Sequence, residues 1–110
     1  MDERAERLAR NELLYRNVNE RLKELGEGFS GVAKTAVFVC ECGLVECTER
    51  VSLTLAEYEE VRSEPTHFAV KLGHEMPEME DVIVENDRFA VVGKRPGGPA
   101  ELAIAHDPRS

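Results

Sequence analysis

The three cysteines of this chain lie within eight residues, in the segment CECGLVEC that spans residues 40–47. Three is an odd number for disulfides. The N-terminal segment MDERAERLARNELL is charged from its second residue and has no long apolar run, so it predicts neither a signal peptide nor a membrane span. We therefore expect a cytoplasmic protein, in which thiols stay reduced and metal or redox chemistry is favoured over a disulfide.

The spacing C-x-C-x4-C predicts a zinc knuckle. Zinc binds thiolates at about 2.3 Å in a tetrahedron. Cys40 and Cys42 can reach one ion if the backbone turns sharply after them, and Gly43 permits such a turn. With Cys47 the loop supplies three thiolates and leaves the fourth vertex for a histidine or a water molecule.

His74 is the favoured fourth ligand. It follows Gly73 at the end of a predicted strand, where a loop can bend, and a ligand from a distant segment would tie that strand to the cysteine loop. His67 begins the same strand and is the alternative if the strand pairing runs the other way. His106 lies in a predicted C-terminal tail and is the least favoured. The sequence thus predicts a Cys3His zinc site.

The cysteine segment resembles the post-SET zinc knuckle of histone-lysine methyltransferases, which has the same spacing and a glycine after the second cysteine. In that family a fourth cysteine comes from the catalytic domain. The resemblance covers residues 40–47 only, and the chain is too short to contain a SET domain. It implies that this spacing holds zinc with one remote ligand, and it implies nothing about methyl transfer.

A larger part of the chain, from about residue 10 to residue 94, is similar to a group of small, uncharacterised actinobacterial proteins. The likeness rests on RNELLYRNVNERLKEL, on FVCEC with the third cysteine, on VSLTLAEYEEVR, on Gly-His-Glu at 73–75 and on RFAVVGK. It implies a bacterial protein in which His74 is a ligand. Because the group usually has a basic residue where this chain has His67, the likeness implies that His67 is incidental. It implies no activity.

Length and charge limit the function classes. With 110 residues we expect one domain: an N-terminal helix in 1–28, a zinc-bearing core in 29–105 and a tail in 106–110. The aromatic residues are few, so a metal would help to stabilise a mostly aliphatic core. The 22 acidic and 14 basic residues give a formal net charge of −8, which disfavours nucleic-acid binding.

Residues 3–25 are predicted to form one helix, capped by Asp2 and ended by the segment LGEG. Its apolar residues recur at near-heptad spacing, including Leu8, Tyr15, Val18 and Leu22. Packing of this stripe onto the domain's own sheet is favoured over self-association as a homodimer. The same stripe is also the expected surface for a partner protein.

The exposed face of this helix is predicted to carry charged pairs with i,i+4 spacing, among them Glu12 with Arg16. A second, short helix is predicted to begin at Leu55, because Thr54 and Glu57 form a capping-box pattern, and to end before Pro65.

The rest of the chain predicts short strands. The segments with strand character are 35–42, 50–54, 67–73, 81–85 and 88–94, followed by 101–105 as a last strand. Asn86 and Asp87 are expected to form a hairpin turn and tolerate left-handed conformations. The predicted fold class is α+β: a long N-terminal helix, a small, mostly antiparallel sheet of about five strands, one short second helix and a zinc knuckle.

Three functions fit these patterns. The favoured one is a protein-interaction or regulatory module in which zinc is structural. The first alternative is a redox sensor in which oxidation releases zinc and forms a disulfide such as Cys40–Cys47. The second is a zinc hydrolase with water as fourth ligand and Glu75 as general base. We expect no enzyme, because three thiolates make zinc a poor Lewis acid and the HExxH and zinc-deaminase motifs are absent from the sequence.

Overall fold

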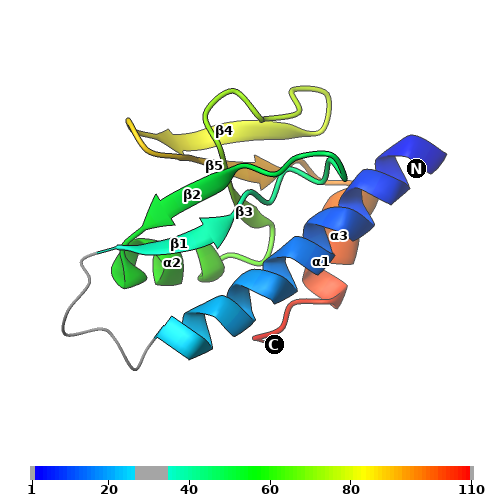
Figure 1. Ribbon diagram of the computed structural model, residues 1–110. Coiled ribbons are helices and arrows are strands. Elements are labelled where there is room, and N and C mark those ends of the chain that lie inside the picture. Colours follow the sequence, from blue (N-terminus) through cyan, green and yellow to red (C-terminus); the bar gives the residue numbers. More distant parts are fainter. Residues whose placement is uncertain (1, 27–34, 110) are drawn as a thin grey trace.

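The computed structural model describes residues 2–26 and 35–109 of the chain. The elements are α1 (Glu3–Gly26), β1 (Ala36–Val39), β2 (Arg50–Leu53), α2 (Leu55–Arg62), β3 (His67–Val70), β4 (Glu80–Glu85), β5 (Ala90–Lys94) and α3 (Gly98–Ala105) (Figure 1). This confirms the α+β class, the long N-terminal helix and the five antiparallel strands. The predicted boundary between helix and core, at residues 28 and 29, lies outside the described residues.

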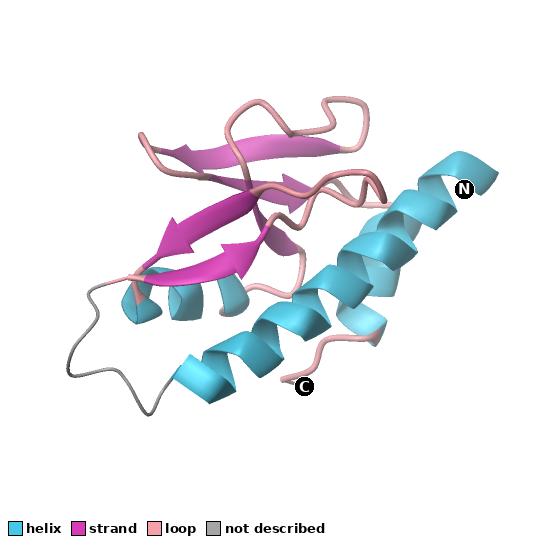
Figure 2. Ribbon diagram, in the orientation of Figure 1, coloured by secondary structure: helices cyan, strands magenta, loops and turns pink. Residues whose placement is uncertain are grey.

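The strands form two sheets instead of one (Figure 2). β1 and β2 pair as an antiparallel hairpin, and the cysteine segment is the loop between them. The second sheet is antiparallel with strand order β3-β5-β4. The backbone N–H of Glu41 donates to the carbonyl of Ala69 in β3 at 2.9 Å, so the cysteine loop connects the two sheets.

The segment predicted as a last strand is instead the helix α3. A short apolar run such as ELAIA does not distinguish strand from helix by periodicity. Pro99 lies in the first turn, where its missing N–H costs nothing, and alanine favours the helix. Ala100 and Ala103 are buried, and α3 lies beside α1 (Figure 1).

α1 begins as predicted, with Asp2 Oδ1 accepting from the backbone N–H of Ala5 at 2.7 Å. The prediction that Glu12 and Arg16 lie on the exposed face is wrong, because each is only 1 % exposed. The reason is that both side chains find polar partners inside the protein. The Arg16 guanidinium, for example, donates to the carbonyls of Pro65, Ala103 and His106.

The apolar residues of α1 are divided between the core and the surface. Leu8 is buried, and Leu22 packs against a buried cluster to which β1, β2, α2 and the three-stranded sheet all contribute. Tyr15 is half-buried, whereas Val18 is exposed. Leu14 is also exposed, so the outward apolar face is displaced from the predicted stripe.

α2 carries the predicted capping box, in which Thr54 Oγ1 accepts from the Glu57 N–H and the Glu57 carboxylate accepts from the Thr54 N–H. Tyr58 and Val61 face inward, and the Tyr58 ring stacks on Phe38 of β1 with centroids 4.5 Å apart. This stacking holds α2 against the first sheet. Among residues 2–26 and 35–109, no helix is both long and apolar enough to cross a membrane.

The β4–β5 hairpin turns at Asn86 as predicted, but not by a left-handed conformation. No non-glycine residue in the described part of the chain has positive φ. Instead, Asn86 Oδ1 accepts from the N–H groups of Arg88 and Phe89, at 2.8 and 2.9 Å. The side chain therefore stabilises the turn.

Candidate metal centre

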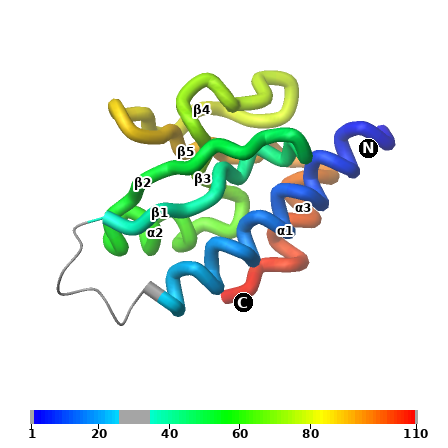
Figure 3. Tube along the Cα trace, viewed as in Figure 1, coloured from blue at the N-terminus to red at the C-terminus, as the bar shows by residue number. Residues whose placement is uncertain are grey.

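The cysteine loop turns at Gly43, which has a φ of +86°. A Cβ at this position would lie 2.8 Å from the carbonyl oxygen of Leu8, so only glycine fits both the backbone conformation and the space. Asn11 donates to the Gly43 carbonyl at 2.9 Å. Figure 3 shows the loop between β1 and β2 lying beside the N-terminal half of α1, and these contacts hold it there.

The loop and the end of β3 bring together the four residues predicted as ligands. The ligand atoms of Cys40, Cys42, Cys47 and His74 all lie within 4.8 Å of one another. His74 Nδ1 is 3.7 Å from the Cys40 sulfur and 3.6 Å from the Cys47 sulfur. In a tetrahedral zinc site the bond lengths place a sulfur and a nitrogen ligand about 3.6 Å apart. The group can therefore hold a metal ion, with Nδ1 as the histidine ligand.

His74 is positioned by a turn after β3. Gly73 has a φ of +84°, and the His74 N–H donates to the carbonyl of Lys71 at 2.9 Å. The Lys71 N–H in turn donates to the Cys40 sulfur at 3.2 Å. An N–H donor next to a thiolate stabilises its negative charge, so the same turn supplies one ligand and supports another.

The three sulfur atoms differ in burial and in protonation. Cys40 and Cys42 are buried, and Cys47 is half-buried. A hydrogen bond with Cys40, opposed by burial, lowers the pKa of Cys42 to about 5. The same bond and burial raise the pKa of Cys40, and burial raises that of Cys47. The cluster thus favours one thiolate on its own, and a bound cation would offset the repulsion between three.

Glu41, the residue between the first two cysteines, anchors the loop from inside the protein. Its carboxylate is fully buried and accepts from the Arg62 guanidinium at 2.7 and 3.2 Å. It also accepts from Asn19 Nδ2 at 2.7 Å and from the Ala69 N–H at 2.8 Å. Cys40 and Cys42 therefore flank a buried, fully hydrogen-bonded anion that links α1, α2 and β3.

A second buried group of charged residues lies next to Gly43. Lys94 Nζ donates to Glu12 and to Glu80, at 2.7 Å and 2.5 Å. Burial raises the pKa of Glu12 to about 8, although Lys94 opposes the shift. The Glu12 side chain would also be 3.0 Å from a Cβ at Gly43, so this group packs directly against the loop.

Sequence reasoning missed both buried ionic groups. Glu80 ends the acidic segment EMPEME at 75–80, which gives no sign of burial, and Glu41 carries no signal beyond its place between two cysteines. The ionic partner is 21 residues away for Glu41, 14 for Glu80 and 82 for Glu12, so no local pattern reveals these pairs.

The two other histidines lie away from the cluster. His67 is opposite Gly93 in the β3–β5 pairing and lines a groove described below. His106 follows α3, and its carbonyl accepts from Arg16. Glu75 follows His74, and one of its carboxylate oxygens is buried without a hydrogen-bond partner among the described residues.

Comparison of the chain with protein-family models, with curated proteins and with solved structures found no match. The resemblances to the post-SET knuckle and to the actinobacterial group therefore stay predictions. What the structure shows is a Cys3His cluster, able to hold a metal ion, between two small sheets.

Proposed function

We propose that this chain is a small cytoplasmic zinc protein in which a structural Cys3His site holds the fold and the surface binds another protein. One observation carries the zinc assignment: four protein ligand atoms from two segments lie within 4.8 Å of one another. Thiolates and imidazole suit zinc, whereas magnesium and calcium take oxygen ligands. Sites that fill all four vertices with protein ligands are structural, and catalytic zinc sites keep one vertex open.

The same geometry argues against the hydrolase alternative. That mechanism needs a water molecule at the fourth vertex and Glu75 close to it. His74 Nδ1 lies at 3.6 to 3.7 Å from two of the sulfurs, at the distance of a ligand. We therefore propose that the protein is not an enzyme.

The direct test is the metal content of purified protein. We expect about one zinc per chain in the wild type and in His67→Ala, the matched control, because His67 lies outside the cluster. In His74→Ala, zinc affinity should fall by about 100-fold or more, since even loss of an outer-sphere partner costs about 10- to 100-fold. His74→Cys keeps four ligands and should retain zinc. Equal affinity in the wild type and both alanine variants would contradict the Cys3His assignment.

A redox sensor is the second candidate function, and the exposure of Cys47 favours it. Cys40 and Cys42 are buried, but Cys47 is half-buried and open to an oxidant. Peroxide would remove two electrons from two thiolates and join them as a disulfide such as Cys40–Cys47, with loss of the metal. A peroxide titration with a zinc-sensitive dye separates the two functions. Zinc release at low peroxide excess would support the sensor, and its absence would support a structural site.

The outer face of α1 is the first proposed contact surface. Of the predicted contact residues, Leu8 and Leu22 pack against the chain's own core, which leaves Tyr15 and Val18 accessible, with Leu14 beside them. An apolar helix face of this kind pairs with another helix, and a second copy of the chain supplies one. Light scattering should then give a dimer for the wild type and a monomer for Leu14→Glu/Val18→Glu. A monomeric wild type would exclude the homodimer.

A further inference from the structure

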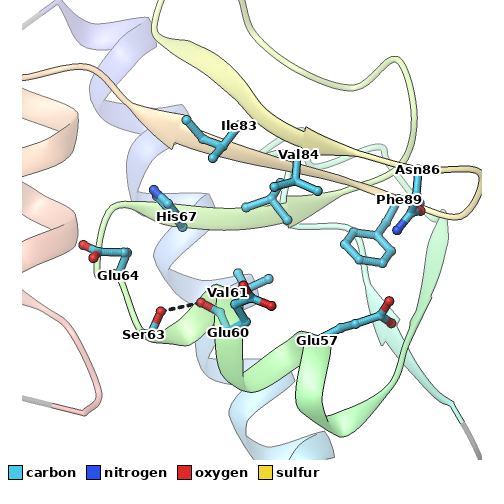
Figure 4. Close-up of a pocket in the computed structure, with 11 residues that line it drawn as sticks. Glu57, Glu60, Val61, Ser63, Glu64, His67, Ile83, Val84, Asn86 and Phe89 are labelled. Atoms are coloured by element: carbon cyan, nitrogen blue, oxygen red, sulfur yellow. Dashed lines mark hydrogen bonds between the residues drawn. The ribbon is translucent and has the colours of Figure 1, made fainter.

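A groove with an acidic rim lies between α2 and the β4–β5 hairpin (Figure 4). Its volume is about 370 Å³, and its floor is apolar, with Val61 from α2, Val84 from β4 and Phe89 before β5. The α2 side carries Glu60 and Glu64. The groove is separate from the metal centre, because none of its lining residues belongs to the Cys3His cluster.

One wall of the groove is an edge strand. β4 pairs with β5 on one side and with no other strand of the described chain. Its residues Val82, Ile83 and Val84 are 42 %, 51 % and 51 % exposed. An edge of this kind presents free backbone N–H and C=O groups next to apolar side chains, which is a template for another strand.

A bulge directs β4 toward the groove. The pairing with β5 shifts register between Val82 and Val84, which leaves Ile83 as the extra residue. A Cβ on Gly93 of β5 would lie 3.1 Å from the Ile83 side chain, so the glycine makes room for Ile83 to lie over β5. Bulges commonly re-aim one side chain in this way. Ile83 and Val84 both line the groove.

The charges around the groove are unbalanced. Glu57 is paired with Arg88 at 2.6 Å. For Glu60, Glu64 and Glu85, in contrast, no cation of the described chain lies within ion-pair distance. Glu60 on α2 and Glu64 just after it line the groove, and Glu85 ends β4 without lining it. Such a surface attracts a positively charged segment.

The charges of β4 disfavour pairing of this edge with a second copy of the chain. Two β4 strands paired antiparallel about Ile83 would place Asp81 of each strand, which Arg95 contacts at 3.0 Å, opposite the unpaired Glu85 of the other. Like charges directly opposite each other destabilise a strand pair. The acidic flanks therefore select against self-pairing and favour a strand with basic flanks.

We propose that the free edge of β4 and the adjoining groove bind an extended segment of another protein, in which apolar side chains alternate between flanking lysines or arginines. The segment adds to the β3-β5-β4 sheet as a fourth strand. Its apolar side chains enter the groove over Val84 and Phe89, and its basic residues meet Glu60 and Glu64. This inference rests on the proposed interaction function, and it names a surface different from α1 and the chemistry of the partner.

The test is a selection from a random octapeptide phage library on full-length, zinc-loaded protein. Zinc content is measured on the same sample, so failure of the metal assignment and failure of the groove are distinguishable. Enriched peptides are synthesised and titrated into ¹⁵N-labelled protein. We expect basic residues flanking alternating apolar ones, and chemical-shift changes confined to β4, β5 and α2.

The matched variants are Glu60→Gln/Glu64→Gln and, as a control of equal charge change, Glu24→Gln/Glu101→Gln, whose glutamates are exposed on α1 and α3. At low salt the first should weaken binding of the enriched peptide by about 3- to 10-fold, because two exposed ion pairs are lost. The control should change it by less than about 2-fold. The proposal is overturned if zinc-loaded protein enriches no peptide, if the shifts map to α1, if both variants bind alike, or if β4 pairs with a second copy.

Discussion

At the scale of single residues, Gly43 and Gly73 form the two backbone turns of the metal centre, and their surroundings differ. Both have positive φ, at +86° and +84°. A Cβ at Gly43 would collide with the backbone carbonyl of Leu8, whereas a Cβ at Gly73 would meet nothing within 4 Å. The cysteine loop is thus constrained by packing under α1, while the turn before His74 is constrained by conformation alone.

This difference predicts unequal costs for the same substitution. Gly73→Ala should lower the free energy of unfolding by about 1–2 kcal/mol, the cost of a left-handed alanine. Gly43→Ala should lower the free energy of unfolding by about 3 kcal/mol or more, because the clash with the Leu8 carbonyl adds to the cost of the left-handed conformation. Denaturant unfolding of the zinc-loaded proteins measures both. Equal losses would show that the loop does not pack against α1 as described.

The buried carboxylate of Glu41 makes a second residue-scale prediction. Arg62→Met removes the guanidinium that pairs with it and leaves a buried, unpaired anion, which should cost about 3–5 kcal/mol of unfolding free energy. Arg88→Met breaks an arginine–glutamate pair of similar length that is partly exposed, and should lower the free energy of unfolding far less, because solvent screens the pair. A small effect of Arg62→Met in chemical denaturation would contradict the anchoring role of Glu41.

α1 shows, at the scale of elements, what local pattern predicts and what it does not. Its start, its length and its cap follow from Asp2 and from the absence of proline and glycine before Gly26. The inward face of α1 does not follow from the local sequence, because Glu12 and Arg16 are buried and bind partners that are distant along the chain. Charged residues at i,i+4 spacing predict an exposed helix face, and only the folded structure shows that Glu12 and Arg16 have buried partners instead.

α3 shows the other limit of local pattern. Its apolar run was compatible with a strand or a helix, and contact with α1 decided for the helix. The β1–β2 and β4–β5 hairpins, in contrast, were predictable from strand runs and turn residues. No short-range signal reveals that the two hairpins belong to separate sheets, or that Glu41 of the cysteine loop connects these sheets through Ala69.

Glu12 makes a pH-dependent prediction for α1. Burial raises its pKa from 4.5 to about 8, so between these values the native state binds the proton more tightly than the unfolded chain. The contribution of Glu12 to stability is therefore complete below pH 4.5 and is lost as pH rises through about 8. At about 1.4 kcal/mol per pKa unit, the loss can reach a few kcal/mol.

The measurement is the difference in unfolding free energy between Glu12→Gln and the wild type across this range. Glutamine cannot ionise, so the variant should gain stability relative to the wild type as pH rises from 5 to 8, while the titration of the metal ligands is common to both proteins. Glu3→Gln, on the exposed first turn of α1, is the control and should show a flat difference. A flat difference for Glu12→Gln would mean that Lys94 keeps Glu12 ionised.

At the scale of the whole molecule, the metal centre connects the two sheets. Cys40, Cys42 and Cys47 lie in the loop of the two-stranded sheet, and His74 follows an edge strand of the three-stranded sheet. An isolated two-stranded sheet is at best marginally stable in water, so the β1–β2 sheet depends on its contacts with the rest of the chain. The Cys3His spacing was predictable from the cysteine count and from the place of His74 after a strand, whereas the buried charges that support it appear only in three dimensions.

X-ray absorption at the zinc edge of purified, metal-loaded protein is the sharpest test of the Cys3His assignment. We expect a coordination shell of three sulfurs at about 2.3 Å and one nitrogen at about 2.0–2.1 Å, with imidazole scattering that disappears in His74→Ala and persists in His67→Ala. A first shell of three sulfurs and one oxygen in the wild type, or an imidazole signal that survives in His74→Ala, would contradict it.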